Sequence, residues 1–182
     1  MKLQDVATIT EGFNKAQHHE NSSLREIIVE HSLIGELLRN LWRHGTTDVE
    51  ILRSEFDGFG YDLVVSRDNV VRHLQLKSGT GSRPKQVGVS LRLATKPSAC
   101  VLFVCVDDEL NLGPYYWFGG APGEQLQGLE LLPILKRTTR NKKGEQPNRT
   151  RHRVLKPAEF TRLDNIDALI EKLLGSRVLK SD

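Results

Sequence analysis

An uninterrupted apolar run, residues 99–106 (ACVLFVCV), lies in the middle of this sequence. A run of this length without polar alternation is typical of a β-strand that is buried on both faces. Such a strand needs a packing layer on each side of its sheet, and segments of strand-like and helix-like periodicity flank the run. The sequence therefore predicts an α/β fold in which helices flank a central sheet.

Two cysteines, Cys100 and Cys105, belong to this run. Five residues apart on one strand, they are too distant to form a disulfide. Small buried thiols of this kind are typical of reduced intracellular proteins. We therefore expect both to be free core residues of a cytoplasmic protein.

The composition is that of a globular protein. Of the 182 residues, 38% are hydrophobic and 27% are charged, which argues against global disorder and fibrous repeats. No apolar run approaches the roughly 18 to 20 residues of a membrane-spanning helix, and the first residues lack the apolar core of a secretory signal. We expect one domain over residues 1–182: a weakly ordered arm (1–22), a core (23–110) and a C-terminal strand–loop–helix extension (111–182).

The clearest periodic segment predicts a helix that is capped by Ser22 or Ser23 and ends at Gly45. Ser23 and Glu26 have the spacing of a capping box, and glycine commonly ends helices. Apolar residues recur at three- and four-residue steps. The predicted buried face consists of Leu24, Ile27, Ile28, His31, Ile34, Leu38, Leu41 and Trp42.

The periodicity then changes to that of strands. Short strands are predicted over residues 49–52, 61–66 and 70–77. Residues 67–69 (Arg-Asp-Asn) are typical of a tight hairpin turn between the last two. Residues 85–96 fit either a strand or a short helix. The other predicted elements are strands over 99–106, 115–118 and 151–155 and a helix over 165–174.

Three polar residues interrupt these strands at informative places. Asp62 opens one strand of the hairpin, and Gln75 and Lys77 lie on one face near the end of the other, because side chains alternate along a strand. Antiparallel pairing about the turn places Asp62 beside Gln75. Carboxylate and amide oxygens are hard ligands for Mg²⁺, and an ammonium can offset charge on a phosphate. The group therefore suits phosphodiester hydrolysis.

The net charge of +3 is unevenly distributed. Residues 136–153 contain eight Lys or Arg and one acid, a local charge of +7, so the remainder carries −4. Such asymmetry favours an anionic partner over this segment, although a solvated loop would have the same composition. The candidates for nucleic-acid backbone contacts in the basic segment 136–156 are Arg137, Arg140, Lys142, Lys143, Arg149, Arg151 and Arg153.

An aromatic cluster, residues 115–118 (Tyr-Tyr-Trp-Phe), precedes two glycines. Core packing is one interpretation of this cluster. Stacking on unpaired bases is the other.

Three short motifs together resemble the PD-(D/E)xK nuclease superfamily, in its branch with Gln in place of the first acid of the ExK element. They are Ile-Gly-Glu at 34–36 on the first helix, Gly-Tyr-Asp-Leu-Val at 60–64, and Gln-Leu-Lys-Ser at 75–78. The resemblance covers roughly residues 24–106. It implies a restriction-endonuclease-like core with a mixed central β-sheet flanked by helices.

The resemblance also implies roles for individual residues. Asp62, Glu36, Gln75 and the Leu76 carbonyl would ligate Mg²⁺ or Mn²⁺, and Lys77 would be the catalytic lysine. Glu36 lies at the edge of the predicted apolar stripe, whereas Glu30 lies inside it and is the alternative helix acid.

The sequence thus predicts a metal-dependent nuclease that hydrolyses phosphodiester bonds in nucleic acid, here expected to be DNA. The competing interpretation is a catalytically inactive nucleic-acid-binding or protein-interaction module on the same fold, since Gln75 removes one negative charge from the site. A homodimer is compatible with either, and no membrane partner is expected.

Overall fold

A computed structural model describes residues 20–56, 58–137, 139, 144 and 146–176. In chain order the elements are α2 (Ser22–Arg43), β1 (Glu50–Arg53), β2 (Leu63–Arg67), β3 (Val70–Thr80), β4 (Val87–Ser90), the 3₁₀ turn η1 (Leu93–Thr95), β5 (Cys100–Val106), β6 (Leu112–Gly119), η2 (Leu129–Leu131), β7 (Ile134–Lys136), β8 (Asn148–Leu155), η3 (Pro157–Glu159), β9 (Thr161–Leu163) and α3 (Ile166–Leu174). The expected arm, residues 1–22, lies almost wholly outside the described residues.

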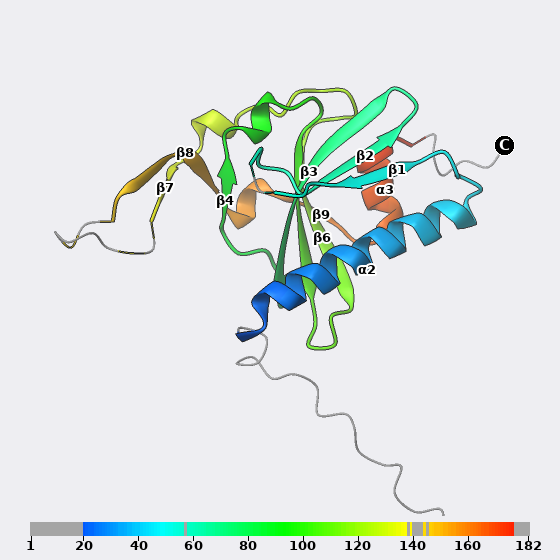
Figure 1. The fold of residues 1–182 in the computed structure, drawn as a ribbon, viewed down its shortest axis with the longest axis horizontal. Helices are drawn as coiled ribbons and strands as arrows, with labels where there is room; N and C mark the ends of the chain where they lie inside the picture. The colour runs from blue at the N-terminus through cyan, green and yellow to red at the C-terminus, as the bar shows by residue number, and fades with distance from the viewer. Residues whose placement is uncertain (1–19, 57, 138, 140–143, 145, 177–182) are drawn as a thin grey trace, which may run out of the picture.

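A six-stranded sheet in the order β1-β2-β3-β5-β6-β9 forms the centre of the molecule (Figure 1). β3 and β5 are parallel and the other neighbouring pairs are antiparallel, so the sheet is mixed. All seven residues of β5 are buried, as its apolar sequence predicts. The predicted α/β class with a mixed central sheet is confirmed.

The two α-helices of the described residues, α2 and α3, lie on one face of this sheet. Alternate residues of β5, including Leu102 and Val104, pack with α2 and α3 in the largest apolar cluster. The opposite face is covered by η1 and by a second sheet of order β4-β8-β7, which meet β5 through Val101. The ambiguous residues 85–96 thus contain both β4 and η1. No helix among the described residues is long and apolar enough to cross a membrane.

The predicted helix is confirmed, but its predicted buried face is wrong. The residues of α2 that pack on the sheet are Val29, Leu33, Leu37 and Leu41. Most of the predicted stripe is exposed, including Leu24, Ile27, Ile28, Leu38 and Trp42. The helix therefore carries two apolar stripes, the predicted one and the one with four-residue spacing from Val29 to Leu41. The second stripe is the one that packs on the strands.

Residues after 110, expected as an extension, are built into the same core. β6 and β9 complete one side of the central sheet, and α3 packs beside α2. β7 and β8 form a hairpin that projects from the molecule on the side away from the β2–β3 turn (Figure 1). That hairpin carries most of the basic segment.

A fully buried arginine, Arg72 of β3, joins several of these elements. Its guanidinium lies 5.2 Å from the ring centroid of Trp117, measured from Cζ. Burial lowers the pKa of Arg72. Its nitrogens donate hydrogen bonds of 2.6 to 3.3 Å to the backbone carbonyls of Ser98, Gly120, Lys172 and Leu173. The last two carbonyls belong to the final turn of α3, so Arg72 fastens that helix end to the sheet.

Candidate functional site

The β2–β3 hairpin sets the position of Asp62. Arg67 pairs with Val70 across a two-residue turn, in which Asp68 has a left-handed φ of 51°. The register runs outward to Leu63 opposite Leu74, and the Asp62 amide donates to the Leu74 carbonyl at 2.9 Å. The next position places Asp62 opposite Gln75, as antiparallel pairing about the turn predicts.

A turn that contains Gly60 directly precedes Asp62 in the chain. Gly60 has φ +81°, and a Cβ there would lie 3.0 Å from the Cβ of Ser90. Any other residue would therefore be both strained and crowded at this position. Glycine at 60 lets the chain enter β2 close under β4.

The carboxylate of Asp62 is held at the edge of the sheet. β2 begins only at Leu63, whereas β3 continues to Thr80, so part of β3 has no β2 partner. There the backbone amide of Leu76 donates a 2.6 Å hydrogen bond to Oδ2 of Asp62. A strand end thus leaves both a gap in the sheet and an amide that orients the carboxylate.

Gln75 and Lys77 lie on the same face of β3, as predicted from strand alternation. Gln75 is only 5% exposed, and its buried Oε1 accepts no hydrogen bond from any described residue. Lys77 is half-buried, and its ammonium forms no ion pair with the residues that the structure describes. Among the described residues neither this buried acceptor nor this cation has a protein partner, and the strand register brings both to the end of β2 at Asp62.

A cleft of about 490 Å³ opens at this gap in the sheet. Asp62, Leu76 and Lys77 line it from the strands, and Glu26 and Glu30 line it from the N-terminal half of α2. The cleft thus has oxygen donors on two sides and an ammonium on one.

The structure does not bring Glu36 to this cleft. Its Oε2 accepts a 2.8 Å hydrogen bond from the hydroxyl of Tyr115 on β6, which is separated from β3 by β5. Burial, reinforced by this carboxylate, raises the pKa of Tyr115. Glu30 precedes Glu36 by six residues, which is well over one turn, so the two side chains leave α2 in different directions. The acids of α2 that line the cleft are Glu26 and the predicted alternative, Glu30.

Glu30 forms an ion pair with Arg53 of β1. This pair could not be predicted from the sequence, because the two residues are 23 positions apart and meet only when α2 packs on the sheet. The pair offsets the charge of one acid in the cleft.

The oxygen donors at the cleft are of the type that binds a hard cation, but their number is small. Among the described residues no group of three or more His, Cys, Asp and Glu side chains could hold a metal ion. Asp62 and Leu76 line the cleft, whereas Gln75 is not among its lining residues; it lies opposite Asp62 by strand register, and its buried oxygen has no partner among the described residues. Oxygen donors of this type are what Mg²⁺ and Mn²⁺ prefer. The orphaned acceptor of Gln75 is the feature that such an ion would satisfy.

Four of the seven predicted nucleic-acid contacts lie among the described residues. Arg137, Arg149 and Arg151 are exposed on the β7–β8 hairpin and its end. Arg153 instead donates to the backbone carbonyls of Glu130, Thr150 and His152, so it is engaged within the protein. Arg140, Lys142 and Lys143 lie outside the described residues.

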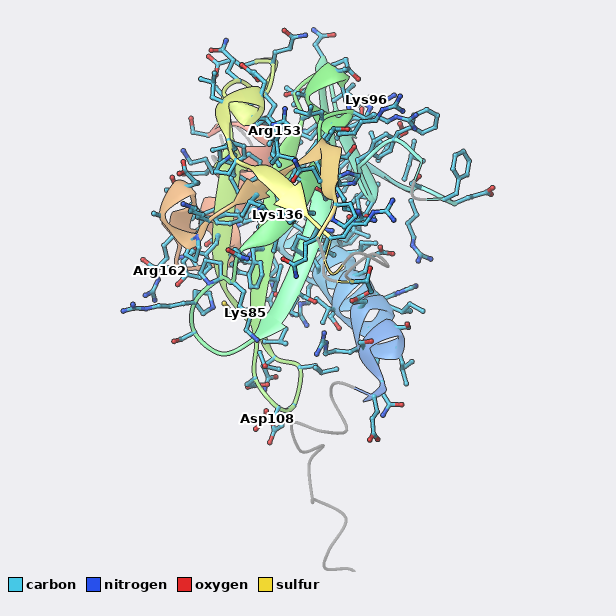
Figure 2. The ribbon with its side chains drawn as sticks, turned by 90° about the vertical axis from the view of Figure 1, so that its left-hand side faces the viewer. Lys85, Lys96, Asp108, Lys136, Arg153 and Arg162 are labelled. Atoms are coloured by element: carbon cyan, nitrogen blue, oxygen red, sulfur yellow. The ribbon has the colours of Figure 1, made fainter. Side chains whose placement is uncertain are left out.

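Viewed from the side of this hairpin, Lys136 and Arg153 lie over the middle of the molecule (Figure 2). Lys85 lies below them and Lys96 above. This side of the protein therefore carries cations beyond those of the basic segment.

The structure agrees with core packing for the aromatic residues 115–118. Tyr115, Tyr116 and Trp117 are buried within the two apolar layers of β6. Different aromatic residues are exposed, Phe56 and Phe59, in the turn between β1 and β2. Their only signal in the sequence was a glycine-rich turn that also contains phenylalanine.

The chain was compared with known protein families, curated proteins and solved structures. No protein-family model and no curated protein matches the chain. Among solved structures, the chain is similar to Hjc, a Holliday junction resolvase from the archaeal hyperthermophile Archaeoglobus fulgidus. The match covers 74% of this chain and 89% of the resolvase, at 14% sequence identity and a TM-score of 0.39.

Proposed function

We propose that this chain is a metal-dependent nuclease that hydrolyses phosphodiester bonds in DNA. The observation that supports the proposal is the meeting of Asp62, Gln75 and Lys77 at the point where β2 ends beside β3, next to a cleft walled by α2. Among the described residues the Gln75 oxygen has no hydrogen-bond partner and the Lys77 ammonium has no ion-pair partner. Together with the Asp62 carboxylate they form a group typical of an active site.

In this proposal Asp62, the Gln75 side-chain oxygen and the Leu76 carbonyl hold a divalent metal ion. When bound, Mg²⁺ or Mn²⁺ would polarise the phosphate and lower the pKa of a water molecule bound to the metal. The Leu76 amide keeps the Asp62 carboxylate oriented toward this task. Glu26 and Glu30, rather than Glu36, are the acids of α2 that line the same cleft.

Lys77 is the proposed catalytic lysine. Its ammonium lines the cleft and has no acidic partner among the described residues, so it is available to a phosphate oxygen. Negative charge grows on the phosphoryl oxygens as water attacks, and a fixed cation within contact distance stabilises that charge. Lys77 would therefore act more strongly on the transition state than on the bound substrate.

The β7–β8 hairpin is the proposed holder of the DNA backbone. Arg149 and Arg151 are exposed there and make no ion pair with the described residues, whereas Arg153 donates hydrogen bonds to backbone carbonyls of the protein. Phosphate contacts of this kind give affinity without sequence preference, and that affinity falls with salt. Replacing Arg149 or Arg151 by alanine should lower the salt slope of DNA binding by about 1 each. Arg153→Ala should not change that slope.

A second candidate, a binding module without catalysis, is favoured by the charge of the cleft. Gln75 is neutral, and the carboxylate of Glu30 is paired with Arg53. The remaining acids of the cleft are Asp62 on the strand side and Glu26 on α2. A site of this kind can bind nucleic acid and leave it intact.

A cleavage assay separates the two candidates. Supercoiled plasmid is incubated with wild type, Asp62→Asn and Lys77→Met, each with Mg²⁺, with Mn²⁺ and with EDTA. The proposal predicts metal-dependent nicking by wild type and a loss of about 100-fold or more in each variant. Asn keeps an acceptor for the Leu76 amide and Met keeps the stem of Lys77, so both variants should fold.

Asp164→Asn is the matched control, because Asp164 is an exposed acid paired with Arg162 outside the cleft. Its nicking rate should equal that of wild type. A wild-type protein that binds DNA but is inert with every divalent ion would refute the nuclease and support the binding module.

A further inference from the structure

The turn between β1 and β2 carries three aromatic side chains. Phe56 and Phe59 belong to none of the buried apolar clusters of the described residues, and Tyr61 packs against the cluster of Val89 and Leu93. Phe56 is 64% exposed, Phe59 is 41% exposed and Tyr61 is half-buried. The ring centroids of Phe56 and Phe59 lie 5.7 Å apart, and those of Phe59 and Tyr61 lie 6.3 Å apart in a stacked arrangement. We call these three residues the aromatic platform.

The aromatic platform adjoins the candidate site at Tyr61. Tyr61 immediately precedes Asp62, and its ring contacts His73 edge-on at 4.9 Å between centroids. His73 lies on the same face of β3 as Gln75, two residues before it. One end of the platform therefore adjoins the site, and the other end is open to solvent.

The turn that presents the platform is braced. The Arg92 guanidinium donates a 2.6 Å hydrogen bond to the Gly58 carbonyl. The Gly58 amide and the Ser54 hydroxyl both donate to the carbonyl of Phe56, at 2.8 and 2.9 Å. These bonds hold the backbone at Phe56 and Gly58.

A cation accompanies the rings. Nζ of Lys96 lies 4.4 Å from the ring centroid of Phe59 and 5.6 Å from that of Tyr61. Figure 2 shows Lys96 on the same side of the molecule as the β7–β8 hairpin. Rings interleaved with cations suit a ligand that has flat π-faces and anionic groups at short intervals.

We propose that the aromatic platform stacks unpaired bases of the nucleic acid, next to the phosphate that occupies the Asp62 cleft. In a duplex the base faces are covered by their neighbours, so a flat ring can reach them only where the strand is single or branched. The preferred substrate is therefore DNA with single-stranded character at the cleavage point. The position of that cleavage point rests on the proposed function, whereas the stacking itself does not.

Binding without cleavage tests the platform. A labelled single strand and a duplex of the same sequence are titrated in EDTA with wild type, Phe56→Ala, Phe59→Ala and the double variant. Each single substitution should weaken single-strand binding about 10-fold, as one lost stacked base does. Duplex binding should stay within about 2-fold, because the phosphate contacts are unchanged.

Two further variants separate stacking from simple apolar contact. Phe59→Tyr keeps a flat ring and should bind the single strand as wild type does, whereas Phe59→Leu should bind it as Phe59→Ala does. Leu131→Ala is the matched control for an exposed apolar side chain, since Leu131 is 84% exposed and far from this turn in sequence. It should bind both DNAs normally.

A base analogue reports stacking directly. 2-Aminopurine in the single strand should lose fluorescence on binding wild type and keep it with the double variant. Equal affinity of wild type and the double variant for the single strand, or an equal loss for both DNAs, would overturn the proposal. So would a wild type that does not bind the single strand, which would leave the rings to a protein partner.

The two proposals can fail separately. Lost stacking in the Phe variants with no metal-dependent cleavage by wild type would refute the nuclease and keep the platform. Cleavage that depends on Asp62 but is unaffected in the Phe double variant on single-stranded, branched and duplex DNA would refute the platform and keep the nuclease.

Discussion

The backbone amide of Leu76 donates a 2.6 Å hydrogen bond to the carboxylate of Asp62, on the side of β3 where β2 has already ended. One contact thus links the end of a strand to the orientation of the acid in the cleft. Because Leu76 lies between Gln75 and Lys77, the same contact fixes Asp62 relative to both. The relative positions of the three site residues therefore follow from the hairpin.

The neutral Gln75 offers a direct test of the metal site. Gln75→Glu places a second carboxylate opposite Asp62, in a buried position. Without metal, the free energy of unfolding should fall by about 1–3 kcal/mol, because the carboxylates repel and one is desolvated. Mn²⁺ should restore stability and raise the melting temperature of this variant more than that of wild type. Gln75→Leu, which removes the orphaned oxygen, should respond to Mn²⁺ less than wild type. An equal Mn²⁺ response in all three proteins would contradict a role for Gln75 at the metal.

The buried face of α2 can be checked with two adjacent leucines. Leu37 is buried against the sheet, and Leu38 is 44% exposed. Leu37→Ala should cost about 2–5 kcal/mol of unfolding free energy by urea denaturation, since it leaves a cavity. Leu38→Ala should cost less than about 1 kcal/mol. The reverse order would mean that the predicted stripe, rather than the observed one, packs on the sheet.

Two arginines of the β2–β3 hairpin should differ sharply in their contribution to stability. Arg72→Met keeps the buried stem but leaves four backbone carbonyls without a donor, so we expect a loss of roughly 3 kcal/mol or more. Arg67 pairs with Asp48, an exposed acid whose pKa this hydrogen bond lowers. Arg67→Met should cost less than about 1 kcal/mol. Similar losses in the two variants, measured by thermal denaturation, would contradict the bracing role of Arg72.

The cysteines should be inert in the folded protein. Burial raises the pKa of Cys100 to about 12 and also raises the pKa of Cys105. At pH 8 roughly one Cys100 thiol in ten thousand is ionised, and the thiolate is the reactive form. Iodoacetamide should therefore leave both thiols unmodified in the native protein and alkylate both in guanidinium, as mass spectrometry can show. Fast alkylation of the native protein would mean that β5 is not buried as described.

The parts of the fold that the sequence predicted depend on local chemistry. The register of Asp62 against Gln75 follows from a two-residue turn, and the burial of β5 follows from its own apolar sequence. The acid that α2 brings to the cleft depends instead on the rotation of that helix. Packing on the sheet fixes the rotation, so the helix sequence alone left Glu30 and Glu36 open.

Long-range pairing explains the other differences. Arg72 is a charged residue within a strand of alternating pattern. Its acceptors in α3, the carbonyls of Lys172 and Leu173, are about 100 residues away in the sequence, so local pattern could not predict these hydrogen bonds. The exposure of Phe56 and Phe59, and the burial of the aromatic residues on β6, depend on which strands become neighbours. Residue type and spacing could not distinguish these two aromatic groups.

Titration calorimetry of Mn²⁺ into wild type and Asp62→Asn tests the central claim most directly. The account predicts one Mn²⁺ site in wild type that is lost in Asp62→Asn, with unchanged circular dichroism because Asn can still accept from the Leu76 amide. Equal Mn²⁺ binding by the two proteins, or no binding by wild type, would contradict a metal site at Asp62.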